Sequence, residues 1–285
     1  MAGFLACVAL ATSRIGLVAH ELVGHGGTAI AVGGHVDEVR LFWFAGGWIH
    51  YQLDSATLAK LLAIAMGGIA VERVAGAAII AASRGRIVRA IGAAIALHGS
   101  WYLATGAWSG FGDGQLLYKV LGDWRYPVAI AAGSITCAAA YFAAKQAFGA
   151  LTSGQHVAWT LVAMAIAAAL NVALAAGELR VRRDRAYAQV MAPERERIVA
   201  RELDAWQASQ GSAITEPAIA EQRAKLEAEH ATFPFAWLLG LCTAIAAIAG
   251  ALRSPRVEIY ALALRRAAIA AAISTGGVIA LSYLL

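Results

Sequence analysis

Long apolar runs, each about the length needed to cross a lipid bilayer, follow one another along most of this 285-residue chain. A transmembrane helix needs roughly 20 consecutive, mainly apolar residues. Runs of that kind cover residues 3–33, 58–82, 90–108, 127–148, 157–177, 234–252 and 257–285. The pattern therefore predicts an all-α polytopic membrane protein with about seven spans.

Between the first two spans, residues 35–52 lose the helical pattern, because β-branched and aromatic side chains gather in two runs around Ala45–Gly47. Two such runs separated by a glycine-rich turn predict a small, membrane-associated β-hairpin. A belt of aromatic side chains at the membrane surface would explain Trp43 and Trp48 equally well, so both interpretations stay open.

Between the fifth and sixth spans, residues 179–233 are polar and predict a soluble helical insertion. Pro193 and the charged residues after it open one helix, and Thr215 is the expected N-cap of a second. Residues 209–213 join the two, which predicts a helical hairpin with a thin apolar stripe of Val199, Leu203 and Trp206. The stripe carries no residue of a catalytic type, and the sequence indicates no partner for the insertion.

These elements group into four regions. Residues 1–121 hold three spans with the hairpin 35–52, residues 122–178 add two spans, residues 179–233 form the soluble insertion, and residues 234–285 form a C-terminal pair of spans. The histidines and acidic residues that lie inside apolar runs belong to the first region, so we expect the chemistry there.

Composition strengthens the membrane assignment, since 60% of residues are hydrophobic, 14% are charged and the mean hydropathy is +0.64. A soluble domain is typically about 25% charged. The net charge of +5 does not indicate nucleic-acid binding, because the insertion is neutral and the excess lies on the spans and short loops. The lipid bilayer is therefore an expected partner, and nucleic acid is not.

Three cysteines, Cys7, Cys137 and Cys242, lie far apart in apolar runs and predict neither disulfides nor a thiolate zinc site. The N-terminus shows no basic leader and no cleavage site, so we interpret the first apolar run as a retained span. We expect an integral protein of a bacterial cytoplasmic membrane.

The first span carries the polar motif HELVGH at residues 20–25. Imidazoles bind zinc, and a neighbouring carboxylate can take a proton from metal-bound water. Zinc proteases space their histidines four residues apart, whereas His20 and His25 are five apart, which splays the rings by roughly 140° in an α-helix. A metal site therefore requires a helix that is bulged or unwound near Gly24. From these six residues alone, two unrelated structural histidines explain the motif equally well.

Other polar residues lie in or beside the second and third spans. Glu72 stands next to Arg73, which favours a structural ion pair or a snorkelling arginine. His98 favours a hydrogen-bonded structural role. Asp113 follows the glycine-rich break at residues 109–112, where it serves either as a helix N-cap or as a group that lines a cavity.

Taken in order, the motif, the hairpin, the Gly67-Gly68 pair and the Asp-Gly at 113–114 make roughly residues 15–121 resemble the site-2 protease family of intramembrane zinc metalloproteases. That family carries H-E-x-x-H on one span and completes its zinc site with the aspartate of an N-x-x-P-x-x-x-L-D-G-type stretch. Two features depart from the family pattern. One residue is inserted within the motif, and Trp-Ser-Gly-Phe-Gly at 108–112 replaces the Asn-Pro segment.

The resemblance implies that His20, His25 and Asp113 hold a Zn²⁺ ion. Glu21 would be the catalytic base. The implied reaction is hydrolysis of a peptide bond in or near a membrane-spanning substrate, by Glu-assisted attack of zinc-bound water. The substrate would be a membrane-embedded protein that unwinds locally and pairs with the edge of the hairpin.

Two imidazoles leave zinc one ligand short of a catalytic set of three. Asp113 is the expected third ligand, because it is polar, lies on flexible backbone and belongs to a segment that can pack against the first span. His50 in the hairpin is the second choice. Glu72 sits in regular helix beside Arg73, which would compete for it. His98 lies about four helical turns, roughly 22 Å, before Asp113.

A different class of function also stays open. In a non-enzymatic ion carrier or scaffold, His20, His25 and Glu72 would line an ion path. A pseudoprotease that binds metal without hydrolysing peptides is a third possibility. Metal content separates the carrier from the protease, and an activity assay separates the pseudoprotease.

Overall fold

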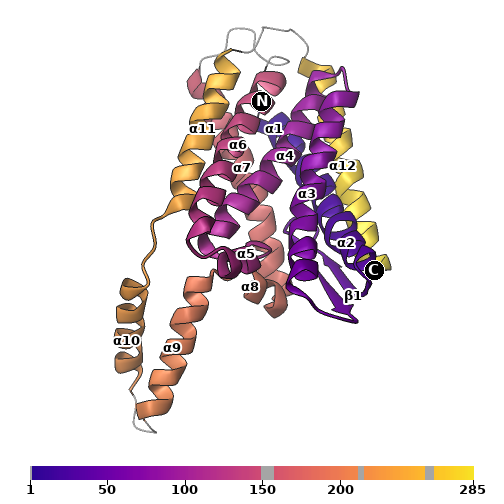
Figure 1. The fold of residues 1–285 in the computed structure, drawn as a ribbon. Coiled ribbons are helices and arrows are strands. Elements are labelled where there is room, and N and C mark those ends of the chain that lie inside the picture. The colour runs from indigo at the N-terminus through magenta and orange to yellow at the C-terminus, as the bar shows by residue number, and fades with distance from the viewer. Residues whose placement is uncertain (1, 149–156, 211–214, 254–259) are drawn as a thin grey trace.

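The computed structural model describes residues 2–148, 157–210, 215–253 and 260–285. Within these residues, seven helices are long and apolar enough to cross a membrane, and they run side by side as one bundle (Figure 1). They cover Gly3–Ala31, Leu58–Ala82, Arg86–Ser109, Gly114–Ala147, Val162–Arg182, Phe235–Leu252 and Leu264–Leu284. The predicted helical architecture and the number of long apolar helices are confirmed.

The first half of the chain contains, in order, α1 (Ala2–Val18), the π-helix η1 (Ala19–Gly26), α2 (Gly27–Ala31), β1 (Gly34–Leu41), β2 (Gly47–Leu53), α3 (Leu58–Ala82), α4 (Arg86–Ser109), α5 (Gly114–Leu121), the short η2 (Gly122–Trp124) and α6 (Arg125–Phe148). The second half contains α7 (Val157–Arg182), α8 (Arg185–Met191), α9 (Glu194–Gln210), α10 (Glu216–Glu229), α11 (Phe235–Leu252) and α12 (Tyr260–Leu284).

The first span changes its winding in the middle, because α1 passes into the π-helix η1 before α2 resumes the ordinary helix. The predicted irregularity at residues 20–25 is confirmed. Glycines let η1 approach α3 closely: a Cβ atom on Gly24 would clash with the Cα of Gly68, and one on Gly68 would lie 2.7 Å from the His20 ring. Small residues at such a contact allow two helix backbones to meet.

The strands β1 and β2 form an antiparallel hairpin with an irregular register between Val36 and Glu38. The predicted hairpin is confirmed. The end of β1 is part of the buried interior, since Leu41 packs against Leu17 of α1 and Val278 of α12. The hairpin is therefore anchored to the bundle at the end where α5 and α8 also lie (Figure 1).

The loop that joins the two strands, residues 42–46, is held by two charged side chains that we call the loop clamp. Arg14 of α1 donates hydrogen bonds of 2.8, 3.0 and 2.8 Å to the carbonyl oxygens of Phe42, Phe44 and Ala45. Glu178 of α7 accepts hydrogen bonds of 2.6, 2.6 and 3.1 Å from the backbone N–H groups of Trp43, Phe44 and Ala45. The clamp thereby ties α7, from the second half of the chain, to the hairpin.

The third span ends in a sharp turn that leads into α5. Gly110 and Gly112 have φ angles of 69° and 51°, a left-handed conformation that glycine adopts without strain. The backbones of Gly106 and Gly114 lie against each other, so a side chain on either would meet the other's main chain. The turn thus holds Asp113 close to the end of α4.

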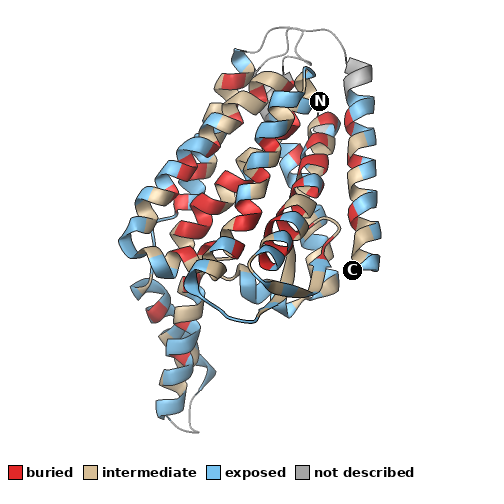
Figure 2. Ribbon diagram, turned by 45° about the vertical axis from the view of Figure 1, so that its right-hand side comes forward, coloured by how far each residue is buried: buried red, intermediate tan, exposed pale blue. Residues whose placement is uncertain are grey.

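α3, α4 and α6 pack together in the interior of the bundle. Figure 2 shows that the buried residues gather on the central helices, whereas the outer helices are mostly exposed. Its largest cluster contains Ile69, Leu103, Ala104, Ala107, Leu117, Ala129, Ala132, Phe235 and Leu239. The outer helices α7 and α12 expose large apolar side chains, among them Val172 and Ile273. Such faces are typical of helices that contact lipid.

The polar insertion forms a helical hairpin of α9 and α10 that projects from one end of the bundle (Figure 1). The predicted stripe of α9 is buried against α10 in a cluster of Val199, Leu203 and Leu226, with Trp206 and Ile219 beside it. Thr215 occupies the predicted N-cap position, but its side chain makes no capping hydrogen bond. Of the predicted connection at 209–213, residues 211–213 lie outside the described residues.

Candidate metal centre

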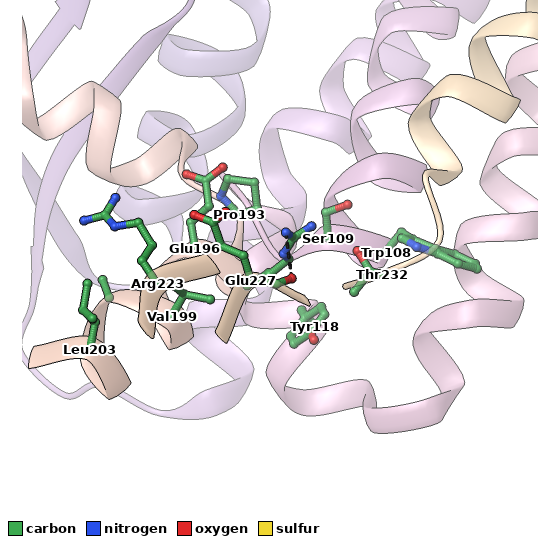
Figure 3. A pocket seen from close by; sticks show the side chains of 12 residues that line it. Trp108, Ser109, Tyr118, Pro193, Glu196, Val199, Leu203, Arg223, Glu227 and Thr232 are labelled. Carbon is green, nitrogen blue, oxygen red and sulfur yellow. Dashed lines mark hydrogen bonds between the residues drawn. The ribbon is translucent and has the colours of Figure 1, made fainter. Parts of the chain in front are cut away.

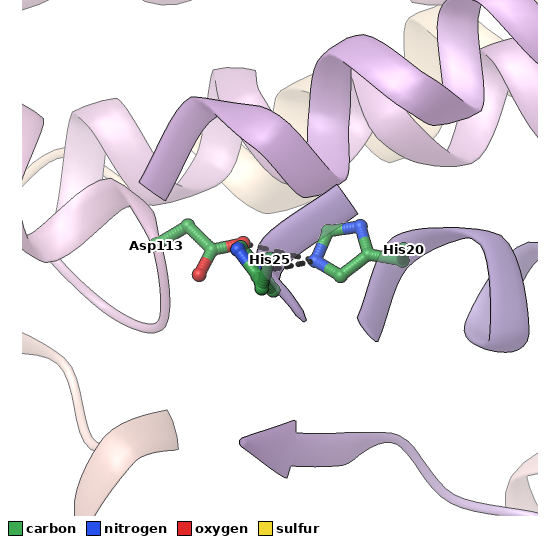
Figure 4. Close-up of side chains that lie close together, drawn as sticks. All are labelled: His20, His25 and Asp113. Carbon is green, nitrogen blue, oxygen red and sulfur yellow. Dashed lines mark hydrogen bonds and ion pairs between the residues drawn. The ribbon is translucent and has the colours of Figure 1, made fainter. Parts of the chain in front are cut away.

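Three side chains, His20, His25 and Asp113, converge at one point beside the hairpin, and we call them the donor triad (Figure 4). The Nε2 atoms of the two histidines are 3.0 Å apart. The Oδ2 atom of Asp113 lies 2.9 Å from Nε2 of His20 and 3.0 Å from Nε2 of His25. Both histidines are buried, so the three atoms meet in the interior of the bundle.

The π-helix is the local structure that brings the two histidines together. In an α-helix, residues five positions apart point in different directions, whereas the hydrogen bonds of a π-helix join residues five apart. η1 spans the whole motif, so His20 and His25 fall on one face of the helix. The extra residue in the motif is thus absorbed by the wider turn, and the predicted approach of the two rings is confirmed.

The far nitrogens of the two rings determine which atoms face the centre. Nδ1 of His25 lies 2.7 Å from the carbonyl oxygen of Ile64, which can only accept, so Nδ1 donates. Nδ1 of His20 lies 3.4 Å from the carboxylate oxygen Oε2 of Glu72, which also only accepts when ionised. Neutral histidines with protonated Nδ1 atoms turn their Nε2 lone pairs toward each other and toward Asp113.

Asp113 completes the group from the turn before α5. Asp113 occupies the N-cap position of α5, as the alternative interpretation expected, but its side chain makes no capping hydrogen bond and faces the two histidines instead. The predicted approach of Asp113 to both histidines is confirmed.

The donor set fits a metal ion. Three electron-pair donors at mutual distances near 3 Å repel one another unless a proton or a cation lies between them. A point equidistant from three atoms so spaced lies about 1.7 Å from each in their plane, and a zinc ion needs about 2.0–2.2 Å, just above that plane. Two imidazole nitrogens and one carboxylate oxygen leave further coordination positions open.

Glu21 lies next to the triad, is buried, and makes no hydrogen bond or ion pair within the described residues. It lines a cavity of about 270 Å³ together with all three triad residues. We call this cavity the site cavity. Residues of β2, α3, α5 and α8, together with Tyr102 and Gly112, form the rest of its wall. The residues from the four elements are Gly47, Trp48, Ile49, Tyr51, Leu61, Ile64, Ala65, Gln115, Leu116, Val190 and Met191. A carboxylate without a partner, facing a cavity, is placed to exchange protons with a molecule inside it.

A larger cavity of about 640 Å³ also borders His20 and Glu21 and extends toward α7. Both cavities are lined by His20, Glu21, Gly47, Tyr102 and Met191. Space for water or for part of a substrate therefore exists in two cavities next to the motif.

The other candidate ligands lie elsewhere. Glu72 contacts His20 and His98 instead of the triad's centre. Of the two structural interpretations of Glu72 and Arg73, an ion pair between these neighbours does not form among the described residues, and the snorkelling arginine stays a prediction. The expectation of a hydrogen-bonded His98 is confirmed by its 2.9 Å contact with Glu72. His50 is exposed and pairs with Asp37 on the hairpin, so it does not approach the triad.

Two further contributors to the site were not predicted from the sequence. Tyr102 of α4 stacks edge-on against the His20 ring, and its hydroxyl accepts a 3.4 Å hydrogen bond from the backbone N–H of Asp113. The short helix α8 lines part of the site cavity through Val190 and Met191, and the carbonyl oxygen of Val190 accepts a 2.9 Å hydrogen bond from the N–H of Gly112. The sequence offered one weak signal for Tyr102, its place in the third span less than three helical turns before the glycine-rich break. No pattern in the sequence indicated that α8 would lie beside the site.

A third cavity, of about 560 Å³, lies between the insertion and the bundle and is shown in Figure 3. Trp108, Ser109 and Tyr118 line it from the bundle, and residues of α9 and α10 line the rest together with Pro193 and Thr232. It shares no residue with the cavities beside the triad, and opposite charges such as Arg223 and Glu227 balance each other on its wall. It is a junction between two parts of the chain rather than a second site.

No family model matches the chain, and the searches of curated proteins and of solved structures gave no match. The geometry and the chemistry of the donor triad are therefore the basis of the functional proposal.

Proposed function

We propose that this protein is an intramembrane zinc metalloprotease that hydrolyses a peptide bond in or near a membrane-spanning segment of a protein substrate. The observation that carries the proposal is the convergence of three metal donors, within 3.0 Å of one another, beside the unpartnered carboxylate of Glu21. The resemblance of residues 15–121 to the site-2 protease family supports the same function through the same four residues.

His20, His25 and Asp113 would hold the metal, which leaves a coordination position facing the site cavity. When bound, zinc supplies a Lewis acid that polarises the substrate carbonyl and makes a water molecule acidic enough to attack near neutral pH. Glu21 accepts the proton of the attacking water. It then returns that proton to the leaving amine, which completes the hydrolysis with no net change in the enzyme.

The strand β2 offers a place for the substrate. Gly47, Trp48, Ile49 and Tyr51 of β2 line the site cavity, and within the described residues only β1 pairs with β2. The second edge of β2 can therefore hydrogen-bond to an extended peptide. Peptide bonds of an intact helix are shielded by their own hydrogen bonds, so a substrate helix must unwind before it reaches Glu21.

One observation favours a second candidate function, metal binding without hydrolysis. α8 borders the site cavity through Val190 and Met191, and its backbone is hydrogen-bonded to Gly112 beside Asp113. Because the chain's own helix takes up part of the wall beside the triad, less of the cavity is left for a substrate, which suits a metal-binding pseudoprotease.

The test measures bound metal and peptide cleavage in the purified full chain. We expect about one zinc per chain in the wild type and loss of that zinc in Asp113→Ala, and we expect the wild type but not Asp113→Ala to cleave a transmembrane reporter. Asp123→Ala is the matched control, because Asp123 is exposed and lies ten positions further along the chain. Wild-type protein without metal contradicts the proposal, and metal with no cleavage of any membrane-embedded reporter favours the pseudoprotease.

A further inference from the structure

A second acidic residue lies wholly inside the bundle, outside the donor triad. Glu72 of α3 is 0% exposed, although it belongs to an apolar span. Removing an ionisable group from water is costly, so such residues usually have a functional partner. Arg73, its neighbour in the chain, is not that partner.

Two glycines on neighbouring helices make the space that the Glu72 carboxylate occupies. A Cβ atom on Gly99 of α4 would lie 2.8 Å from Oε2 of Glu72, and one on Gly16 of α1 would lie 3.1 Å from Oε1. A larger residue at either position would press on the carboxylate. The packing of α1 and α4 against α3 therefore accommodates this side chain specifically.

Within that space the carboxylate spans two histidines. Its Oε1 atom lies 2.9 Å from Nδ1 of His98. Its Oε2 atom and Nδ1 of His20 are both buried, have no hydrogen-bond partner among the described residues, and lie 3.4 Å apart. The other nitrogen of His20 is the one that faces Asp113.

We propose that Glu72 is a positioning residue for the metal centre, which holds the His20 ring and keeps its proton on Nδ1 so that the Nε2 lone pair faces the ion. The inference rests on the proposed metal site and adds a residue that supports it from behind. Carboxylates that accept a hydrogen bond from a metal-ligating histidine fix its tautomer and orientation in this way.

The comparison with His25 explains why His20 needs such a partner. Nδ1 of His25 is fixed by a backbone carbonyl, that of Ile64, at 2.7 Å. His20 has no backbone acceptor at Nδ1 among the described residues. Without Glu72, His20 can carry its proton on Nε2 and donate it to Oδ2 of Asp113, 2.9 Å away. In that arrangement Nε2 of His20 has no lone pair left for the metal, and Oδ2 of Asp113 already uses one lone pair to accept the proton.

The test compares metal affinity across variants of the full-length protein in detergent, measured by competition with a chromophoric zinc chelator. We expect Glu72→Leu to bind zinc about 10–100-fold more weakly than the wild type. We expect a smaller loss in Glu72→Gln, because an amide oxygen can still accept from Nδ1–H. Arg73→Leu is the matched control, since it removes a charge from the next position of the same helix without touching His20, and its affinity should equal that of the wild type.

A second readout separates positioning from a general effect on folding. The visible spectrum of the Co²⁺-loaded protein reports the ligand geometry, and it should change in Glu72→Leu but not in Arg73→Leu. If Glu72→Leu does not fold, Gly99→Ala replaces it, because the new methyl group displaces the carboxylate and should also weaken zinc binding.

Each outcome decides between the two proposals. The role of Glu72 is overturned if Glu72→Leu binds zinc with wild-type affinity and its Co²⁺ spectrum is unchanged. Where Gly99→Ala replaces Glu72→Leu, wild-type zinc affinity in Gly99→Ala overturns it. Both results leave the proposed metal site intact. A wild-type protein that binds no zinc overturns the proposed function, and this inference with it.

Discussion

Two groups of buried polar atoms lie near each other in this bundle, and they differ in how their hydrogen-bonding capacity is used. In the loop clamp, Arg14 gives N–H groups to three backbone carbonyls, and Glu178 receives three backbone N–H groups. Donors and acceptors match. In the donor triad, each histidine presents its Nε2 atom as an acceptor when its own Nδ1 atom carries the proton. Oδ2 of the ionised Asp113 is the third acceptor.

The difference separates a structural group from a binding site. Buried polar groups are stable when each donor meets an acceptor, and a group with acceptors alone is stable when a cation joins them. The clamp is complete without a ligand, whereas in our proposal a metal ion would supply the positive charge that the triad lacks. Burial and charge alone would not distinguish the two, because both groups are buried and both contain a carboxylate.

The largest expected effect is the loss of metal from the triad. His25→Ala removes one of the three metal donors. The only hydrogen bond that Ile64 loses is the one from His25 to its carbonyl oxygen, so the substitution should leave the fold intact. We expect the zinc content to fall from about one per chain toward zero, measured by elemental analysis after dialysis. His35→Ala, on the exposed side of the hairpin, is the control and should keep its zinc. Full zinc occupancy in His25→Ala would contradict the metal site.

The next effect is on catalysis without loss of metal. Glu21→Gln keeps the size of the side chain but cannot accept the proton of the attacking water, so kcat should fall by about 10²–10⁴-fold. The zinc content should stay unchanged, because Glu21 is not one of the three donors. Cleavage of a transmembrane reporter and elemental analysis of the same preparation give the two numbers. Equal cleavage by this variant would remove Glu21 from the mechanism.

A substitution in the loop clamp should lower the stability of the fold and leave zinc binding unchanged. Arg14→Leu leaves the carbonyl oxygens of Phe42, Phe44 and Ala45 without their charged donor, so we expect about 3–5 kcal/mol lower stability of the folded state, since a hydrogen bond to a charged group contributes about 1.5–3 kcal/mol. The zinc affinity of the folded fraction should be close to that of the wild type. Thermal unfolding in detergent measures the first quantity and chelator competition the second. A variant that loses zinc affinity without losing stability would show that the clamp belongs to the site.

Much of this arrangement could be predicted from the sequence, because it depends on local patterns. Apolar length predicted the long helices, and the two runs around Ala45–Gly47 predicted the hairpin. The five-residue spacing predicted a bulged helix, since only that winding places His20 and His25 on one face. Asp113 followed from the need for a third donor on irregular backbone.

The remaining parts depend on contacts between distant spans, for which no local pattern exists. Glu72 stood beside Arg73 in sequence, but the packing of α1, α3 and α4 decides that its carboxylate meets His20 and His98. The roles of Gly16 and Gly99 follow only from that packing. Likewise, nothing local indicated that Glu178 would reach a loop more than a hundred residues earlier in the chain.

The smallest expected effect tests whether proximity of a histidine to a carboxylate is enough for a metal site. His50 and Asp37 are 3.0 Å apart, the same distance as His25 and Asp113, but the His50 side chain is 61% exposed. Exposed pairs of this kind contribute about 0–1 kcal/mol, because water solvates both groups and screens their charges. We expect His50→Ala to keep its zinc content, and its zinc affinity should stay within about twofold of the wild type, since the pair lacks a third buried donor. If His50→Ala instead lost zinc, the hairpin would supply a metal ligand. The distinction between the exposed His50–Asp37 pair and the buried donor triad would then fail.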